Sequence, residues 1–233
     1  PTLQIVEMWG CWTSRPEMFY PDRFAVSDEF TKKVVLKRGA PEKCVKITGN
    51  PSFDGFYHCN LKETVIKNSG FMGTRNLVYI GQVSPDNFTT FDWALKSLGT
   101  NDRVAFAKHP RDIRNYDTLL LQAGNKLLDT NLKGDDLLKQ ADICLTHSST
   151  MGVKASLLGI PTINFILDDD QVEVRQICGD FPLVLAEGSY KADSLETFKN
   201  LLKQDLVVNQ SKLRSSLNID GMSAGRVVDY LLS

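Results

Sequence analysis

Short apolar runs alternate with stretches of helical periodicity from about residue 70 to the end of the chain. Several of these runs are apolar throughout, as is typical of strands that carry helices on both faces of a sheet. Their alternation with helical patterns predicts βαβ units and one parallel sheet of about six strands. The predicted strands are Leu77–Ile80, Val104–Ala107, Lys126–Leu128, Ile143–Thr146, Thr162–Ile166 and Leu183–Leu185.

Helices are predicted between and after these strands. The clearest one follows Ser194, because Leu195, Phe198 and Leu201 recur at the spacing of one helix face. The predicted helices are Thr89–Lys96, Tyr116–Ala123, Asp135–Gln140, Thr150–Leu158, Ser194–Lys203 and Ala224–Leu232. Together, the strands and helices predict an α/β domain of the Rossmann-like class, with a final helix at its end.

A second, shorter α/β pattern precedes this domain. Ser27 and Asp28 can cap a helix over Phe30–Lys37, and Gly39 can end it. Strands are predicted on both sides of this helix, at Leu3–Met8, Phe24–Val26 and Lys46–Thr48.

These patterns divide the chain into three segments. Residues 1–57 hold too few elements for an independent sheet, residues 58–73 have the polar composition of a linker, and residues 74–233 form the larger domain. The chain starts without methionine and almost directly with a strand. We therefore expect it to be part of a longer protein, whose N-terminal domain ends at about residue 57.

Charge and cysteine content narrow the classes of function. Lys and Arg number 27 and Asp and Glu 28, so no general attraction to nucleic acid or to an acidic membrane is expected. No apolar run approaches the roughly 18 residues of a membrane-spanning helix. The five cysteines form no CxxC pair and no metal-ligand spacing. This pattern predicts the reduced thiols of an intracellular protein, with no disulfide frame, no metal and no cofactor.

The most informative segment is a predicted buried strand that leads straight into hydroxyl residues opening a helix. The first N–H groups of a helix lack partners and carry the positive end of its dipole. The hydroxyls of Ser148, Ser149 and Thr150 add donors at the carboxyl end of a parallel strand, so this spot suits a phosphate or diphosphate. The alternative is that Ser148 or Ser149 only caps the helix.

A second group of candidate residues follows another predicted strand. Lys108, His109 and Arg111 offer three donors to an anion, and we expect His109 to reach the ligand from the same sheet edge as the serines. His147 either lies near the site or is a packed side chain. His58, in the linker, is expected to be exposed.

Other residues that attract attention have simpler explanations. Gly81, after the first strand of the larger domain, either lets backbone approach a ligand closely or makes a tight turn. Asp168, Asp169 and Asp170 cannot easily converge on one metal ion, so a solvated loop is expected. Cys144 has no evident base beside it and is expected to be a buried thiol. The chain lacks the G-x-G-x-x-G, Walker, H-E-x-x-H and G-x-S-x-G motifs.

Several motifs together resemble the GT-B superfamily of nucleotide-sugar enzymes. Four resemble the end of its N-terminal domain: Tyr20-Pro21-Asp22, Ser27-Asp28-Glu29, Lys37-Arg38-Gly39-Ala40-Pro41 and Ile47-Thr48-Gly49-Asn50-Pro51-Ser52-Phe53-Asp54. Five resemble its C-terminal domain: Lys108-His109-Pro110, Ala141-Asp142-Ile143, Ser148-Ser149-Thr150, Ala155-Ser156-Leu157-Leu158-Gly159-Ile160-Pro161-Thr162 and Asp220-Gly221-Met222-Ser223-Ala224-Gly225-Arg226. The nearest relatives are surface- and capsular-polysaccharide glycosyltransferases and non-hydrolysing UDP-N-acetylglucosamine 2-epimerases.

The resemblance implies a two-domain enzyme with its active site between the domains and a nucleotide-sugar donor bound by the C-terminal half. His109 would be the catalytic residue that helps to neutralise the leaving group. By matching motif, Ser148, Ser149 and Thr150 would hold the nucleotide diphosphate. We expect Gly81, Gln82 and Lys108, which follow the strands beside them, to contribute to the same diphosphate site.

Two positions depart from the family pattern. Epimerases have a His-Arg-rich motif where this chain has Gly81-Gln82-Val83, which favours a transferase. Many relatives have a glutamate for the ribose where this chain has Lys154, so ribose recognition must differ. In this family the N-terminal domain supplies the acceptor site and usually the general base. We therefore expect donor binding, but no turnover, by this chain alone.

The sequence thus predicts a glycosyltransferase of cell-surface polysaccharide synthesis, of the capsular or lipopolysaccharide type. Its partners would be a nucleotide-sugar donor and a saccharide or lipid-linked acceptor, and it would work in the cytoplasm or at the inner face of the membrane. One alternative is an enzyme like the UDP-N-acetylglucosamine 2-epimerases. Another is a non-catalytic carbohydrate-assembly module, which Lys154 favours.

Overall fold

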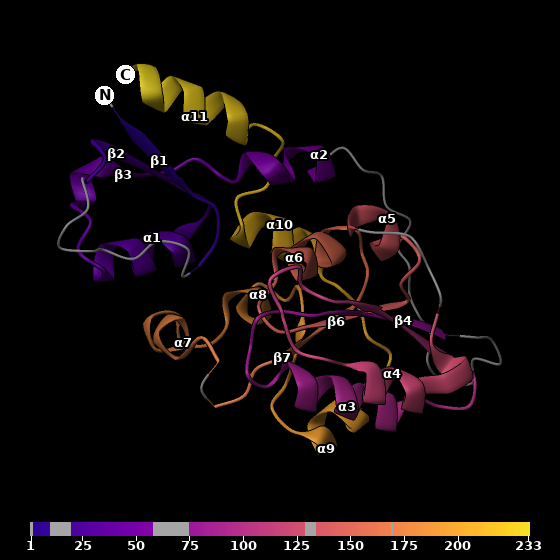
Figure 1. Cartoon of the computed structure of the whole chain (residues 1–233). Coiled ribbons are helices and arrows are strands. Elements are labelled where there is room, and N and C mark those ends of the chain that lie inside the picture. The colour runs from indigo at the N-terminus through magenta and orange to yellow at the C-terminus, as the bar shows by residue number, and fades with distance from the viewer. Residues whose placement is uncertain (1, 10–19, 58–74, 129–133, 169) are drawn as a thin grey trace. The chain divides into compact units, whose positions relative to one another are not determined.

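The computed structural model describes residues 2–9, 20–57, 75–128, 134–168 and 170–233. The chain forms two structural units, each with its own parallel sheet (Figure 1). The first unit comprises Pro1–Asn60, Gln171–Glu187 and Asn209–Ser233, and the second Leu61–Asp170 and Gly188–Val208.

The sheet of the second unit has five parallel strands in the order β5-β4-β6-β7-β8. They are β4 (Arg75–Ile80), β5 (Asp102–Ala107), β6 (Ile143–Thr146), β7 (Thr162–Phe165) and β8 (Tyr190–Ala192). Along β4, Leu77 and Tyr79 pack into one hydrophobic cluster, whereas Val78 and Ile80 pack into another. Successive side chains of a strand point to opposite faces, so this sheet is buried on both sides. The burial of both faces explains the continuous apolar runs in the sequence.

Helices cover both faces of this sheet (Figure 1). They are α3 (Asn87–Ser97), α4 (Asp117–Ala123), α5 (Gly134–Leu138), α6 (Thr150–Leu157) and α9 (Leu195–Leu201). Phe91 of α3, Leu119 of α4 and Phe198 of α9 belong to the cluster on one face. Leu138 of α5 and Ala155 of α6 belong to the cluster on the other.

The structure corrects two of the predicted strands. Around Lys126–Leu128 the chain forms the 3-10 turn η3 (Gly124–Lys126), and Leu127 makes only an isolated parallel bridge with Val104. The run Leu183–Leu185 lies in the short helix α8 (Pro182–Leu185), with Pro182 at its first position, where proline favours a helix start. The fifth strand is β8 instead, so within the described residues the sheet has five strands, where about six were expected.

The first unit has a three-stranded parallel sheet in the order β1-β2-β3, so the expectation that residues 1–57 hold too few elements for an independent sheet is wrong. Its strands are β1 (Leu3–Val6), β2 (Arg23–Val26) and β3 (Val45–Ile47), and α1 (Glu29–Lys37) packs against them. Asp28 caps α1 by accepting a hydrogen bond from the Thr31 N–H at 2.7 Å. Gly39, with φ of +97°, follows the helix end in the left-handed conformation that glycine favours. The capped helix predicted from the sequence is therefore confirmed.

The other helical elements of the first unit come from three parts of the chain. They are η1 (Glu42–Cys44), η2 (Pro51–Phe53), α2 (Asp54–Tyr57), α7 (Val172–Cys178), α8, α10 (Gln210–Ser216) and α11 (Ser223–Leu232). The carboxylate of Asp54 accepts hydrogen bonds from the Ser223 and Ala224 N–H groups at 3.1 and 2.9 Å. Arg226 of α11 donates to the Thr48 carbonyl at 2.8 Å.

The two structural units divide the chain differently from the predicted segments, and the domain division itself stays a prediction. The final helix was assigned to the domain over residues 74–233, but α11 belongs to the first unit, as do α7, α8 and α10. The predicted linker over residues 58–73 lies outside the described residues. Of the helices that the structure describes, none combines the length and the apolar character that crossing a membrane requires.

Candidate functional site

The predicted phosphate site at the start of α6 lies at the carboxyl end of β6. Ser149 takes the N-cap position with extended backbone, and Thr150 is exposed at the first helical position. The Ser149 Oγ accepts a hydrogen bond from the Met151 N–H at 3.1 Å. A Cβ on Gly152 would lie 2.9 Å from the Thr146 methyl group, so this glycine lets the first turn of α6 approach the sheet closely. Ser149 is therefore a cap, and its contact with a ligand stays a prediction.

Gln82 brings a hydrogen-bond acceptor to the same helix start. It follows β4, the neighbour of β6 in the sheet. Its Oε1 accepts from the backbone N–H of Ser148 at 2.7 Å and lies 3.4 Å from the Ser148 Oγ. The backbone N–H of Gln82 in turn donates to the Asn87 side chain at 3.1 Å. A side-chain oxygen thus binds the backbone just ahead of α6, where an anion would find the same donor.

Packing within the second unit explains why residue 81 is a glycine. Its N–H donates to the Ala107 carbonyl at 2.8 Å, where β4 and β5 both end. A Cβ on Gly81 would lie 3.2 Å from that oxygen and 3.3 Å from the Asn87 Nδ2. The glycine therefore allows close packing of β4 against β5 and Asn87. Its approach to a ligand stays a prediction.

A charged pair, which we call the Asp112–Arg114 clasp, holds the loops after β4 and β5 together. Arg114 donates to both carboxylate oxygens of Asp112, from Nε and Nη2, at 2.8 Å each. It also donates to the backbone carbonyls of Ser84 and, at 3.2 Å, Gln82. The Arg114 guanidinium holds the pKa of Asp112 well below its ordinary value. The clasp therefore fixes the backbone of Gln82 through a charge-assisted network.

The buried end of the clasp continues into the core of the second unit. The Tyr116 hydroxyl donates to Asp112 at 2.7 Å and accepts from the Asn87 side chain at 2.7 Å. Tyr79 donates to the Asn87 Oδ1 at 3.1 Å. Sequence reasoning missed this network, although Asp112, Arg114 and Tyr116 lie in one polar segment after β5. Their partners are on a different loop, and no local spacing reveals such pairing.

Lys108 and His109 lie where the sequence predicted them, directly after β5. The Lys108 Nζ donates to the Arg114 carbonyl at 2.6 Å and lies 5.7 Å from the centre of the Tyr116 ring. The His109 Nδ1 accepts from the Arg111 N–H at 3.1 Å, which leaves Nε2 to carry the proton of a neutral ring. Arg111 thus contributes its backbone to orienting His109.

The predicted site has two halves, the β5 loop with His109 and the α6 start with Ser148, and the strand order determines how far apart they begin. β5 and β6 lie on opposite sides of β4, so the backbones that lead to His109 and Ser148 start about 10 Å apart. Since a hydrogen bond spans roughly 3 Å, both side chains have to reach toward the end of β4 to share one phosphate group, which stays a prediction. Gln82 lies at the end of the strand between them. A ligand that contacts both halves therefore has to pass over the end of β4, where Gln82 lies.

His147 belongs to a buried polar chain, so the packed-side-chain interpretation is confirmed. Its Nε2 lies 2.9 Å from the Thr90 Oγ1, and its Nδ1 lies 2.9 Å from a carboxylate oxygen of Asp170. The Thr90 hydroxyl is 2.7 Å from the Tyr79 hydroxyl. The expectation of a solvated acidic loop is therefore wrong for Asp170, because its carboxylate turns inward to the imidazole. Asp169 lies outside the described residues.

Two other sequence candidates have structural roles. Cys144 is fully buried within β6, and burial raises the pKa of its thiol to about 12, as expected for an inert side chain. Lys154 of α6 donates to the two carboxylate oxygens of Asp135 at 3.0 and 3.3 Å. The cation at the position of the family's ribose glutamate thus has a carboxylate partner from α5.

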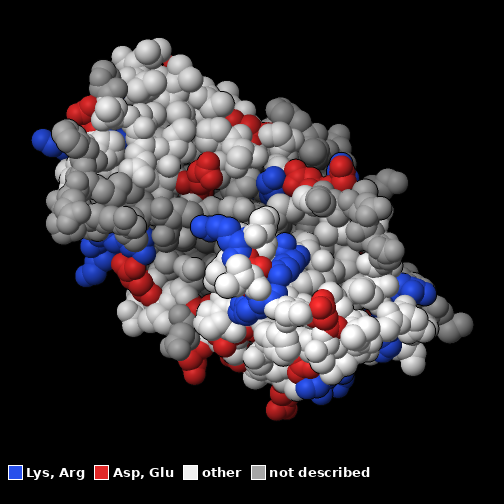
Figure 2. All heavy atoms as spheres, viewed as in Figure 1, with Lys and Arg blue, Asp and Glu red and all other residues white. Residues whose placement is uncertain are grey.

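Charge is mixed over most of the molecular face in Figure 2, where one group of Lys and Arg side chains gathers near the middle. Among the residues that the structure describes, no three His, Cys, Asp or Glu side chains are grouped so as to hold a metal ion. At the α6 start the structure places hydrogen-bond donors and the positive end of the helix dipole.

Comparison with solved structures identifies the fold. The UDP-GlcNAc 2-epimerase of Methanocaldococcus jannaschii, solved with UDP-GlcNAc and UDP, matches 91% of this chain at 18% identity and a TM-score of 0.63. Alr3699/HepE of Anabaena, solved with UDP and glucose, matches 92% at 11% identity and a TM-score of 0.60. The fold is that of GT-B nucleotide-sugar enzymes.

This result confirms the α/β architecture that the motifs implied. The chain spans 61% of the Methanocaldococcus epimerase chain and 64% of the Anabaena chain, so it corresponds to part of each. No protein-family model matches the sequence, and no curated protein sequence matches it significantly.

Proposed function

We propose that this chain is the donor-binding part of a glycosyltransferase that uses a nucleotide-activated sugar in cell-surface polysaccharide synthesis. The observation that carries the proposal is the hydrogen bond between the Gln82 side chain and the backbone N–H of Ser148. It supports the proposal because a backbone N–H just ahead of α6, at the carboxyl edge of a parallel sheet, takes a side-chain oxygen from another loop as its acceptor. The GT-B fold adds support, because two proteins that share it were solved with UDP.

In this proposal the diphosphate crosses the end of β4. Ser148, Ser149 and Thr150 donate to one phosphate at the α6 start, and Gln82 lies beside it. Lys108 and His109 face the other phosphate from the β5 loop. The Nε2 proton of His109 then stabilises the charge that develops on the leaving group. Two contact regions about 10 Å apart suit a diphosphate better than one phosphate.

Ribose recognition must use groups other than the glutamate of the family. Lys154, which stands at that position, is paired with Asp135 in an ion pair whose carboxylate is about half exposed. The acceptor site and the general base are proposed to reside in the N-terminal domain of a longer protein. That protein would work in the cytoplasm or at the inner face of a membrane, on a saccharide or lipid-linked acceptor.

The second candidate function is a UDP-GlcNAc 2-epimerase, which the fold of the Methanocaldococcus enzyme favours. Against it, β4 leads into Gly81-Gln82-Val83 instead of a His-Arg-rich motif. A protein with both domains, incubated with UDP-GlcNAc and no acceptor, separates the two functions. An epimerase converts the sugar at C2 under these conditions, whereas a transferase does not.

Isothermal titration of this chain with UDP, CDP and GDP tests the donor site. We expect one of the three to bind, and binding of none would favour a non-catalytic assembly module. The Gln82→Glu variant adds a negative charge within hydrogen-bond distance of Ser148, so it should weaken diphosphate binding about tenfold or more. Binding of the bare nucleoside should change little.

The matched control is Gln122→Glu, which makes the same change on the exposed side of α4 in the same unit. It should leave the affinity within about twofold of the original. Equal affinities of the Gln82→Glu and Gln122→Glu variants would contradict a diphosphate at the α6 start.

A further inference from the structure

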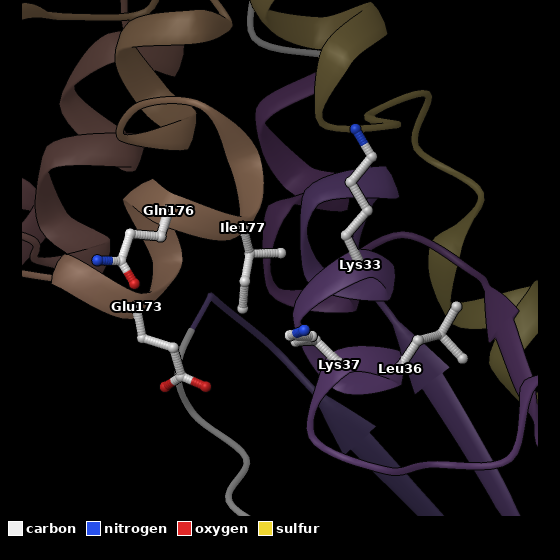
Figure 3. Close-up of a pocket in the computed structure, with 6 residues that line it drawn as sticks. All are labelled: Lys33, Leu36, Lys37, Glu173, Gln176 and Ile177. Carbon is white, nitrogen blue, oxygen red and sulfur yellow. The ribbon is translucent and has the colours of Figure 1, made fainter.

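A pocket of about 770 Å³ lies between α1 and α7 in the first unit. Figure 3 shows its lining side chains, which come from these two helices. They are Lys33, Leu36, Lys37, Glu173, Gln176 and Ile177. Small-molecule sites typically measure about 300–1,000 Å³, so the pocket is large enough for a sugar-sized ligand and not only for an ion.

The charged groups around this pocket leave an excess of two positive charges. Arg38 and Glu173 neutralise each other: the Arg38 Nε donates to a Glu173 carboxylate oxygen at 3.1 Å, and the guanidinium lowers the pKa of that carboxyl. Among the described residues, no ion pair or side-chain hydrogen bond involves the ammonium groups of Lys33 and Lys37. Their ammonium groups are therefore available to an anion.

Lys33 also acts electrostatically on α7. Burial raises the pKa of the Cys178 thiol; the positive charge of Lys33 opposes this rise, and the negative charge of Asp28 adds to it. Since Cys178 is the last residue of α7, the charge of Lys33 reaches the helix on the other side of the pocket. The half-buried side chains of Leu36 and Ile177 add an apolar surface, one from each helix.

We propose that this pocket binds an acidic saccharide, with the phosphate or carboxylate group on Lys33 and Lys37 and the sugar ring against Leu36 and Ile177. The two ammonium groups supply the charge complement, and the apolar side chains suit the face of a sugar ring. Gln176 offers an amide to the hydroxyls. The site lies on elements of the first unit and does not depend on the nucleotide site at α6.

Titration monitored by NMR, with glucuronate, glucose 1-phosphate and glucose as probes, tests this proposal. We expect at least one of the two anions to bind, and glucose to bind at least tenfold more weakly. The two anionic probes distinguish a carboxylate ligand from a phosphate ligand. Glucose binding as well as both anions, or no binding of either anion, would overturn the proposal.

Variants of the charged groups should change the anion affinity in opposite directions. Lys33→Gln and Lys37→Gln should each weaken it about tenfold, because each removes one charge-assisted contact. Glu173→Gln should strengthen it about threefold or more, because it removes the one negative charge among the side chains that line the pocket. This gain of affinity cannot result from loss of folding, so a failure to see it would count against the proposal.

Lys32→Gln is the matched control. Lys32 lies on the same helix but faces Glu42 at 3.8 Å and does not line the pocket. The anion affinity of this variant should stay within about twofold, and so should that of Gln82→Glu, which tests the nucleotide site. A tenfold loss in Lys32→Gln would show nonspecific attraction to α1 and overturn the proposal.

Discussion

Ser149 has two possible roles at the α6 start that its substitutions can separate. Its Oγ caps the helix through the Met151 N–H, so Ser149→Ala should lower the free energy of unfolding of the second unit by about 1 kcal/mol. The backbone donors remain in this variant, so UDP affinity should fall less than threefold. Urea unfolding and isothermal titration measure the two effects.

Ser149→Asp is the informative companion variant. Aspartate is as good a cap as serine, so stability should be retained, while the added charge should weaken UDP binding about tenfold. If Ser149→Ala instead abolished UDP binding at unchanged stability, the hydroxyl would be a ligand contact and not chiefly a cap.

Single-residue candidates were predictable where the chemistry is local. The capping residues Asp28 and Ser149 precede helical patterns, and Cys144 lies in an apolar run, so their environments follow from their neighbours in sequence. Asp170 was misassigned because its partner, His147, is 23 positions away. An acidic triplet shows that a loop is polar, but it does not show which carboxylate turns inward.

At the scale of elements, the Asp112–Arg114 clasp joins the β4 and β5 loops and fixes the backbone of Gln82. Asp112→Asn keeps an acceptor for Tyr116 but removes the charge, so it should lower the free energy of unfolding by about 2 kcal/mol at pH 7. Because the clasp lowers the pKa of Asp112 in the folded state, its contribution is present above the unfolded pKa of about 3.9 and is lost as pH falls.

Urea unfolding at several pH values measures this prediction. The difference between the original protein and Asp112→Asn should be constant from about pH 7 to 5 and shrink below about pH 4. Asp136→Asn is the control, because Asp136 of α5 forms an exposed ion pair with Lys139 and should contribute little to stability. A difference that grew on acidification would contradict the role of the charged carboxylate.

Elements were predictable from sequence where periodicity and end signals agreed. β4, β5, β6 and β7 are apolar runs followed by polar turns, and the structure places all four in a parallel sheet. Short apolar runs without such agreement were assigned wrongly. The apolar run in α8 fits a buried strand as well as a buried helix, and Pro182 at its first position favours the helix. β8 was missed because its three residues carry little pattern.

The whole chain divides in a way that hydrophobic patterns do not reveal. Periodicity shows that α11 is an amphipathic helix, but not which sheet it covers. The deciding contacts join residues that are far apart in sequence, such as the Tyr230 hydroxyl and the Cys44 carbonyl at 2.8 Å. The first unit is therefore built from three separate segments, and its stability depends on the end of the chain.

This organisation predicts two thermal transitions that respond to different changes. Asp54 caps α11 from a distant segment, so Asp54→Ala should destabilise the first unit by about 1 kcal/mol and lower its transition by roughly 4–8 °C. The nucleoside diphosphate that the proposed α6 site binds should raise only the transition of the second unit. Scanning calorimetry measures both, with Asp229→Ala, an exposed change on the same helix, as a control that shifts neither. If Asp54→Ala instead lowered the transition that the nucleotide raises, α11 would stabilise the nucleotide-binding unit. That result would agree with the domain predicted from the sequence over residues 74–233, which includes α11.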